Sequence, residues 1–223
     1  MRRSYPLTFT LIALNLAAYA FTALASGALG DIPPKTLVET GALYGPFVVF
    51  GGEWWRLFTA MFLHGGAMHL AMNMMSLYIV GRGAELYFSK ATYLAIYLFS
   101  GLIGAEASLY AHPADVAMGA SGAIFGIFGA LVGYFLAFRQ HLGPQAKEVF
   151  QDFMAIIGIN VVLGLAMPSI DMSAHIGGFF TGLVGGVWLA LRPAHLPFFI
   201  AACTALLFAG KAFLETYYAT VFY

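Results

Sequence analysis

The 223-residue chain is 61% hydrophobic and 9% charged, with a mean hydropathy of +0.84 and a formal net charge of zero. Soluble domains carry about 25% charged residues, so this composition excludes a soluble globular protein and indicates an integral membrane protein. The zero net charge gives no reason to expect a nucleic-acid partner, and the single cysteine, Cys203, excludes an intramolecular disulfide.

Seven segments are interpreted as membrane-spanning helices, because a span needs roughly 20 apolar residues. In chain order they are Leu7–Leu29, Ala67–Leu86, Ala91–Tyr110, Ala117–Phe138, Phe153–Met167, Met172–Leu191 and Leu196–Phe213. The fifth is short for a span, and Lys211 and Glu215 interrupt the far end of the last. We therefore expect an all-α transmembrane helix bundle, with a six-span core in residues 1–193 and an extra helix in residues 194–223.

Lysine and arginine predict the orientation, because they collect on the cytoplasmic side of membrane proteins. With a cytoplasmic N-terminus, the inner side receives Arg2, Arg3, Arg82, Lys90, Arg139, Lys147 and Arg192, and the outer side receives Lys35, Arg56 and Lys211. This excess favours an N-terminus inside. The fourth and sixth spans then begin at the outer face, with Ser121 and His175 each about one helical turn inside them. Since no long presequence precedes the first span, we expect a bacterial inner membrane.

The segment between the first two spans has a different character. Asp31–Gly52 is rich in proline and glycine, and Glu53–Arg56 then opens an apolar run that ends at Leu63 and is too short to span. Tryptophan and arginine are typical of the headgroup zone. We expect Gly41–Leu63 to form an outer loop that lies on or partly in the membrane surface.

Polar residues gather at the start of the second span. His69 and Asn73 are four residues apart and share one face of a helix. A neutral imidazole and a carboxamide can both donate hydrogen bonds to an oxyanion, and the alternative is a polar pair that joins two helices. His64, His69 and His175 are candidate zinc ligands, but the His-Glu-x-x-His pattern is absent. We expect no metal and no other cofactor.

Gly119-Ala120-Ser121-Gly122 lies at the start of the fourth span. A lone serine in a membrane helix more often bonds its own backbone or a neighbouring helix. Here, Gly119 and Gly122 allow close backbone approach. A helix start also offers free N–H groups and the positive end of the helix dipole, which a developing oxyanion needs. Ser121 is therefore a candidate nucleophile.

His175 lies near the start of the sixth span, at a depth that matches Ser121. Small residues recur every four positions on both spans: Gly178, Gly182 and Gly186 on the sixth, and Gly122, Gly126 and Ala130 on the fourth. Two faces of small residues allow helices to pack closely. Such packing would bring His175 within reach of Ser121 as its base; the alternative is a histidine that only fills space between helices.

No acidic residue clearly completes a catalytic triad. Asp171 lies four residues before His175, and Asp115 precedes Ser121; we interpret both as solvated or helix-start charges. Glu106, near the outer end of the third span, is expected to form an ion pair or to reach the membrane interface.

Together these residues resemble the rhomboid family of intramembrane serine proteases. The resemblance covers roughly Leu7–Arg192. Its motifs are Trp55-Arg56, His64 with His69 and Asn73, Gly119-Ala120-Ser121-Gly122, and Ala174-His175 followed by Gly178 and Gly182. It implies a Ser–His dyad, with Ser121 as nucleophile and His175 as general base and acid. It also implies that His69, Asn73 and the Ser121 N–H stabilise the oxyanion, with Gly119, Gly122 and His64 in supporting positions.

One position departs from the family pattern. Members often carry a tyrosine four residues after the serine, stacked under the histidine, and Phe125 holds that place here. The Phe125 ring can still stack, but any hydrogen bond through a hydroxyl is lost.

The resemblance implies an endopeptidase whose partners are the lipid bilayer and the transmembrane segments of other proteins, cut near their outer ends. A substrate helix must unwind to expose its carbonyls, and water must enter, with Pro168–Met172 as a candidate lid. The rival functions are a non-catalytic rhomboid-like binder of membrane proteins and a small transporter. Such binders typically lack the serine or the histidine. A transporter is disfavoured because the chain has few buried charges and no repeated halves.

Overall fold

The computed structural model describes residues 4–141 and 171–223, together with residues 143, 148, 150, 151, 154, 155 and 158. Its elements are α1 (Pro6–Ser26), α2 (Pro34–Glu39), β1 (Leu43–Tyr44), α3 (Gly45–Val49), α4 (Arg56–Thr59), η1 (Ala60–Phe62), α5 (Ala67–Tyr87), α6 (Lys90–Ala111), β2 (Val116–Ala117), α7 (Ser121–Phe138), α9 (Met172–Leu191), η2 (Pro193–His195) and α10 (Leu196–Phe222). Most of the expected fifth span, Phe153–Met167, lies outside the described residues, and so does most of the expected lid.

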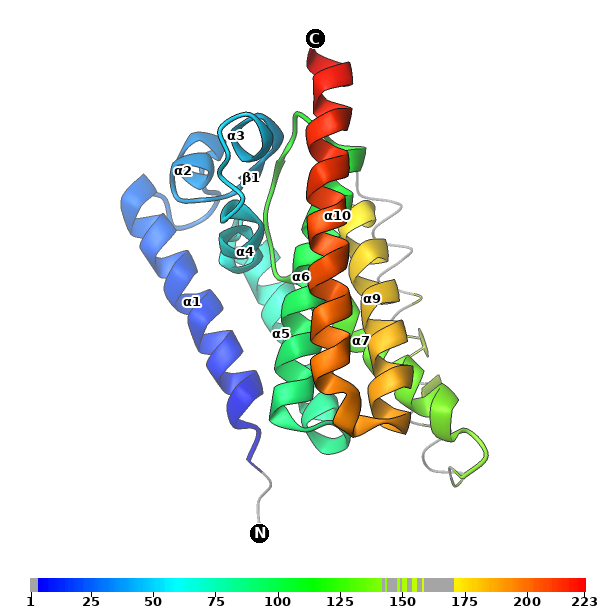
Figure 1. Cartoon of the computed structure of the whole chain (residues 1–223). Helices are drawn as coiled ribbons and strands as arrows, with labels where there is room; N and C mark the ends of the chain where they lie inside the picture. Colours follow the sequence, from blue (N-terminus) through cyan, green and yellow to red (C-terminus); the bar gives the residue numbers. More distant parts are fainter. Residues whose placement is uncertain are drawn as a thin grey trace.

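The long helices form one bundle, as Figure 1 shows. In the described part of the chain, five stretches are long and apolar enough to cross a membrane: α1, α6, α7, α9, and α10 with its preceding turn. Helix α5 has 21 residues, and polar side chains such as His69, Asn73 and Glu85 lower its hydropathy. The prediction of an all-α, multi-pass membrane protein is confirmed.

Helix α7 is the most enclosed of these helices, with 72% of its apolar stretch buried, against 11% for the last helix. It packs against α5, α6 and α9. A Cβ atom added to Gly178, Gly182 or Gly186 would collide with the carbonyl oxygen of Gly122, Gly126 or Ala130, respectively. The predicted contact between the two small-residue faces is therefore confirmed, and only glycine permits it on the α9 side.

Local signals set the ends of several helices. Pro6 starts α1, and Gly27, with a φ of 68°, ends it in the left-handed conformation that glycine accepts most readily. The Ser89 hydroxyl caps α6 by accepting a hydrogen bond of 3.1 Å from the N–H of Thr92. At the same end of the bundle, the Glu85 carboxylate accepts a hydrogen bond of 2.7 Å from the N–H of Thr8, which joins α5 to the start of α1.

A two-stranded antiparallel pairing connects the outer loop to the segment before α7. Leu43 pairs with Ala117, and Tyr44 with Val116. Residues 116 and 117 form a strand, so the helix of the fourth span begins at Ser121 and not at the expected Ala117. This pairing joins residues far apart in the sequence, so local hydrophobicity did not reveal it.

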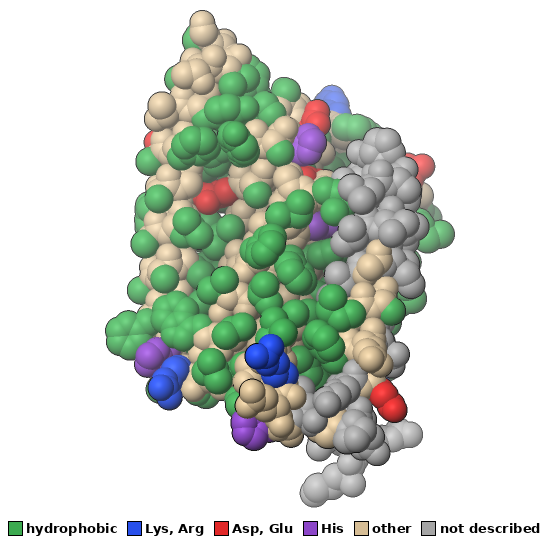
Figure 2. Space-filling view, turned by 90° about the vertical axis from the view of Figure 1, so that its right-hand side faces the viewer, with side chains coloured by type: hydrophobic (Ala, Val, Ile, Leu, Met, Phe, Trp, Pro, Cys, Tyr) green, Lys and Arg blue, Asp and Glu red, His purple; other side chains and the backbone are tan. Residues whose placement is uncertain are grey.

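The surface and the ends of the bundle suit a membrane. On the face shown in Figure 2, hydrophobic side chains dominate the middle, and Lys and Arg lie toward the two ends. The two termini lie at opposite ends of the bundle (Figure 1). Helix α10 continues nine residues past its expected end at Phe213, because Lys211 and Glu215 form an ion pair one turn apart, at 3.8 Å, instead of ending the helix.

Candidate active site

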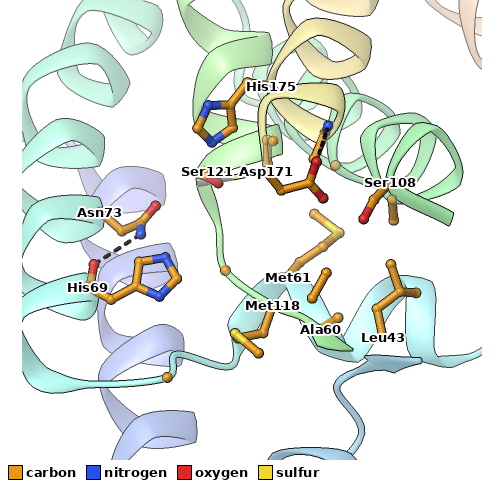
Figure 3. Close-up of a pocket in the computed structure, with 18 of the residues that line it drawn as sticks. Leu43, Ala60, Met61, His69, Asn73, Ser108, Met118, Ser121, Asp171 and His175 are labelled. Atoms are coloured by element: carbon orange, nitrogen blue, oxygen red, sulfur yellow. Dashed lines mark hydrogen bonds between the residues drawn. The ribbon is translucent and has the colours of Figure 1, made fainter. Parts of the chain in front are cut away.

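A cavity of about 780 Å³ lies among the starts of α5, α7 and α9, the end of α6 and the loop Gly41–Leu63. Its lining includes seven of the eight candidate site residues: His69, Asn73, Gly119, Ser121, Gly122, Phe125 and His175. Figure 3 shows His69 and Asn73 on one side of the segment that leads to Ser121, and Asp171 and Ser108 on the other. Residues that are more than a hundred positions apart in the sequence thus line the same cavity.

Ser121 is the first residue of α7, and the prediction that it lies one turn inside the helix is wrong. Gly119, with a φ of 126°, has a conformation that a helix cannot contain, so the helix cannot start earlier. The N–H of Gly119 donates to the Ala60 carbonyl at 2.9 Å, and the first bond of the helix runs from the N–H of Ile124 to the Ala120 carbonyl, also 2.9 Å. The N–H groups from Ser121 to Ala123 therefore precede the helical ladder and remain available to an anion.

His175 lies one turn inside α9 and is 7% exposed. Its ring stacks on that of Phe125, with centroids 4.2 Å apart and an interplanar angle of 10°. The stacking expected from sequence is present. Among the described residues no hydrogen bond joins the Ser121 hydroxyl to His175, and His175 Nδ1 has no hydrogen-bond partner. The imidazole is therefore held by ring stacking and burial.

Gly119 separates His69 from Ser121. A Cβ atom at Gly119 would lie 3.0 Å from both Cε1 and Nε2 of His69, and 3.9 Å from the Ser121 hydroxyl oxygen. The imidazole and the hydroxyl therefore flank the same small space. Asn73 is 7% exposed and donates from Nδ2 to the backbone carbonyl of His69 at 3.0 Å. This bond fixes the carboxamide beside the cavity, one turn along α5 from the imidazole.

His64 is the one candidate residue that does not line the cavity. It is fully buried just before α5, and its ring meets the His69 ring edge-on at a centroid distance of 5.1 Å. Burial, with a smaller contribution from the charge of His69, lowers the pKa of His64 to about 3. A neutral His64 thus supports the His69 ring from behind. Among the described residues, no group of three or more His, Cys, Asp or Glu side chains could hold a metal ion.

Asp171 caps the start of α9, as the sequence predicted for a helix-start charge. Its Oδ1 accepts hydrogen bonds from the N–H groups of Ser173 and Ala174, at 3.0 and 3.1 Å, and from the Ser173 hydroxyl. Burial by itself would raise the pKa of Asp171. Hydrogen bonds from Ser108, Ser173 and Ala174, and the nearby His112, outweigh it and lower that pKa. The ionised carboxylate therefore holds the helix turn that carries His175.

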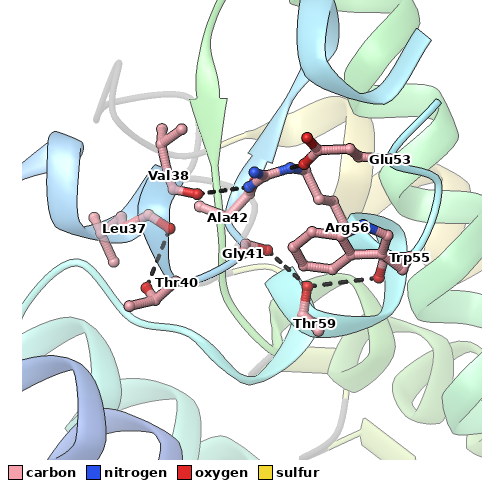
Figure 4. Close-up of polar contacts among 9 residues, drawn as sticks. All are labelled: Leu37, Val38, Thr40, Gly41, Ala42, Glu53, Trp55, Arg56 and Thr59. Atoms are coloured by element: carbon pink, nitrogen blue, oxygen red, sulfur yellow. Dashed lines mark hydrogen bonds and ion pairs between the residues drawn. The ribbon is translucent and has the colours of Figure 1, made fainter. Parts of the chain in front are cut away.

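Arg56 is 5% exposed, because the loop itself encloses its side chain. Its Nη1 donates to the carbonyls of Val38 and Ala42, at 2.6 and 2.9 Å, and its Nε pairs with Glu53 at 2.6 Å (Figure 4). The neighbouring Trp55 is 51% exposed, with the guanidinium 4.7 Å from its ring centroid. Arg56 therefore binds the turns of the outer loop together, a role that its position next to tryptophan did not reveal.

Two further residues differ from expectation or were missed. Glu106 neither pairs with a cation within the described residues nor lies exposed: it is 8% exposed and packs against Gly210 of α10. Ser108 lines the cavity beside Asp171, and its hydroxyl helps to lower the pKa of that carboxylate. A single serine in an apolar helix carries no sequence signal for such a contact.

The Rhomboid domain family matches residues 51–192. The chain is 36% identical over 187 residues to "Rhomboid protease GluP" of Bacillus subtilis (strain 168), covering 84% of this chain and 35% of that protein. It is 36% identical over 182 residues to "RHOMBOID-like protein 6, mitochondrial" of Arabidopsis thaliana, covering 82% and 59%, respectively. It is also 36% identical over 184 residues to "RHOMBOID-like protein 2" of the same plant, covering 82% and 57%. The chain thus spans less than two thirds of the length of each of these relatives.

Proposed function

This chain belongs to the rhomboid family, and we propose that it is an intramembrane serine endopeptidase that cleaves transmembrane segments of other membrane proteins near their outer ends. One observation carries the proposal. Ser121 begins α7, His175 lies on the closely packed α9, and both line the same cavity. Relatives named as rhomboid proteases support the reaction class.

In this proposal Ser121 is the nucleophile and His175 the general base. The Ser121 oxygen attacks the scissile carbonyl carbon while the imidazole takes its proton. The C–N bond then breaks, and His175 returns the proton to the leaving amine. Water, activated by the same imidazole, hydrolyses the acyl-enzyme. Because the hydroxyl and the imidazole are not hydrogen bonded at rest, a rotation of the serine side chain precedes attack. Catalytic hydrogen bonds often tighten only when substrate binds.

The oxyanion is stabilised by the N–H of Ser121, by His69 and by Asn73. The first is a free donor at a helix start, where the helix dipole also favours negative charge. His69 faces Ser121 across Gly119, and a side chain at Gly119 would occupy the space that separates them. Asn73 has a second amide hydrogen beyond the one that it gives to the His69 carbonyl. Small backbone at Gly119 and Gly122 keeps this space open.

The substrate must present an extended backbone to this cavity. A transmembrane helix hides its carbonyls in its own hydrogen bonds, so a segment with helix-breaking residues near its outer end unwinds at the lowest cost. The cavity faces the outer side of the membrane in this proposal, with a cytoplasmic N-terminus, because the expected inner loops carry more Lys and Arg than the outer ones. Residues 1–193 form the catalytic core and residues 194–223 an added helix.

A panel of single-span substrates in liposomes tests the proposal. Intact protein is compared with Ser121→Ala and with His175→Ala. We expect cleavage by the intact protein near the outer end of the substrate helix, and none by either variant. If intact protein binds the substrates and leaves them uncut, the rival function of a non-catalytic binder is correct. Cleavage that persists in either variant would show that the reaction does not depend on a dyad of Ser121 and His175.

A further inference from the structure

The outer end of α10 belongs to a second apolar core, separate from the centre of the bundle. Leu214 and Tyr218 of α10 are buried there with Leu43 and Val48 of the outer loop and Leu109 of α6. The Tyr218 ring also meets that of Phe50, which follows α3, edge-on at 6.0 Å. The last helix therefore holds the outer loop against α6, although most of its length is exposed (Figure 1).

The hydroxyl of Tyr218 reaches the segment that leads to Ser121. Tyr218 is fully buried, and its oxygen lies 2.9 Å from the Leu109 carbonyl and 3.1 Å from the Pro113 carbonyl, to which its proton is donated. A Cβ atom at Gly45 would collide with both the Pro113 carbonyl oxygen and the Tyr218 hydroxyl. The start of α3, the end of α10 and the turn after α6 thus meet at one point, and they are packed too closely there to accommodate another atom.

From Pro113 the chain runs directly into the site. Val116 and Ala117 form β2, which pairs with the outer loop at β1, and two residues later the Gly119 N–H is held by the Ala60 carbonyl. Ser121 follows at once. The backbone that sets the Ser121 N–H and hydroxyl is therefore tied to the outer loop at β2 and Gly119, and to α10 at Pro113. No contact of Tyr218 with the cavity is needed for this.

We propose that Tyr218 is a positioning residue for Ser121, so that the added helix α10 is part of the working site. This rests on the proposed protease function. The hydroxyl fixes the turn after α6, and that turn sets the segment from β2 to Ser121. Removing the hydroxyl loosens this segment. Fewer molecules then hold the Ser121 N–H and hydroxyl in the geometry that the transition state requires, while the cavity that binds substrate is unchanged.

Tyr218→Phe tests the proposal because it deletes one oxygen and keeps the ring contacts. The matched control is Tyr217→Phe on the same helix, because the Tyr217 hydroxyl makes no hydrogen bond in the described part of the chain. A single hydrogen bond corresponds to roughly a three- to tenfold effect. We expect kcat to fall by that factor in Tyr218→Phe, with KM close to that of the intact protein and of Tyr217→Phe. The thermal midpoint in detergent should be slightly lower than in Tyr217→Phe, because the same hydrogen bond also stabilises the fold.

Hydrogen exchange of the peptide that covers residues 113–121 is measured on the same samples, so that the result does not depend on activity. We expect faster exchange there in Tyr218→Phe than in Tyr217→Phe. Unchanged exchange overturns the proposal, even if the intact protein cleaves nothing and the protease function itself has failed. Faster exchange with an unchanged kcat in an active protein also overturns it. That result would show that loosening the segment does not affect the reaction at Ser121.

Discussion

The imidazole of His175 is oriented by an aromatic ring, where soluble serine proteases use an acid. Its Nδ1 has no partner among the described residues, and its ring lies flat on Phe125 at 4.2 Å. The nearest candidate acid, Asp171, instead gives its carboxylate to the first turn of α9. Stacking restricts rotation of the imidazole about its Cβ–Cγ bond and so fixes the plane in which its two nitrogens lie.

Phe125→Ala and Phe125→Tyr test the stacking. An aromatic pair contributes about 0.5–1.5 kcal/mol beyond its buried area, so its loss corresponds to roughly a two- to tenfold change. We expect Phe125→Ala to lower kcat by at least this factor, and Phe125→Tyr to retain the activity of the intact protein. Steady-state cleavage in liposomes provides the measurement. Equal kcat values for Phe125→Ala and the intact protein would show that the ring does not orient His175.

His64 gives the protein a predictable acid sensitivity. Its pKa of about 3 in the folded protein lies below the ordinary histidine pKa of 6.5, which applies to the unfolded chain. Between these values the unfolded state binds the extra proton, so stability is full above about pH 6.5 and falls as the pH drops. The expected loss from this group approaches about 1.4 kcal/mol per pH unit. Thermal unfolding in detergent from pH 7 to pH 4.5 should show a shallower slope in His64→Phe; a slope equal to that of the intact protein would contradict the assignment.

At the scale of single elements, the success of sequence-based prediction followed the range of the interactions. The α7 and α9 faces were predicted because a four-residue repeat of small side chains is local and its consequence is geometric. The start of α7 was not, because β1 pairs with β2 across more than seventy residues. The end of α10 is an exception, because the ion pair between Lys211 and Glu215 is local and its two charges were interpreted as interrupting the helix. The buried Arg56 and Tyr218 make contacts to distant backbone carbonyls, which leave no periodic pattern.

Because α7 and α9 are in close contact, we expect one added methyl group between them to lower both stability and activity. In Gly182→Ala the added Cβ would collide with the Gly126 carbonyl oxygen, so the helices must separate. Overpacking typically costs about 1–3 kcal/mol. We expect a lower thermal midpoint and slower cleavage, since separation moves His175 away from Ser121. Gly30→Ala is the control, because its Cβ meets nothing within 4 Å. A Gly182→Ala protein as stable as Gly30→Ala would refute the close packing.

At the scale of the whole molecule, charge and topology agree with a bundle that crosses the membrane and opens its cavity toward one side. The cavity lies near the end of the bundle that holds the C-terminus, and the N-terminus lies at the other end (Figure 1). If the distribution of Lys and Arg orients the protein as proposed, the C-terminus is outside. The site then meets substrate segments at their outer ends.

Cysteine accessibility tests this orientation. Cys203 is the only cysteine and is buried, so Cys203→Ser provides a silent background. In that background, Tyr223→Cys should react with a membrane-impermeant maleimide added to intact bacterial cells that express the protein, and Ser4→Cys should react only after permeabilisation. The reverse pattern would place the cavity on the cytoplasmic side.

The most direct measurement is covalent labelling of the purified protein by a serine-directed phosphonate, with the modified residue located by mass spectrometry. A neutral hydroxyl reacts slowly unless a base removes its proton. We expect a single adduct on Ser121 in the intact protein, and almost none in a His175→Ala protein that retains the thermal midpoint of the intact protein. Undiminished labelling in His175→Ala would show that His175 does not activate Ser121, and an adduct on another serine would show that Ser121 is not the nucleophile.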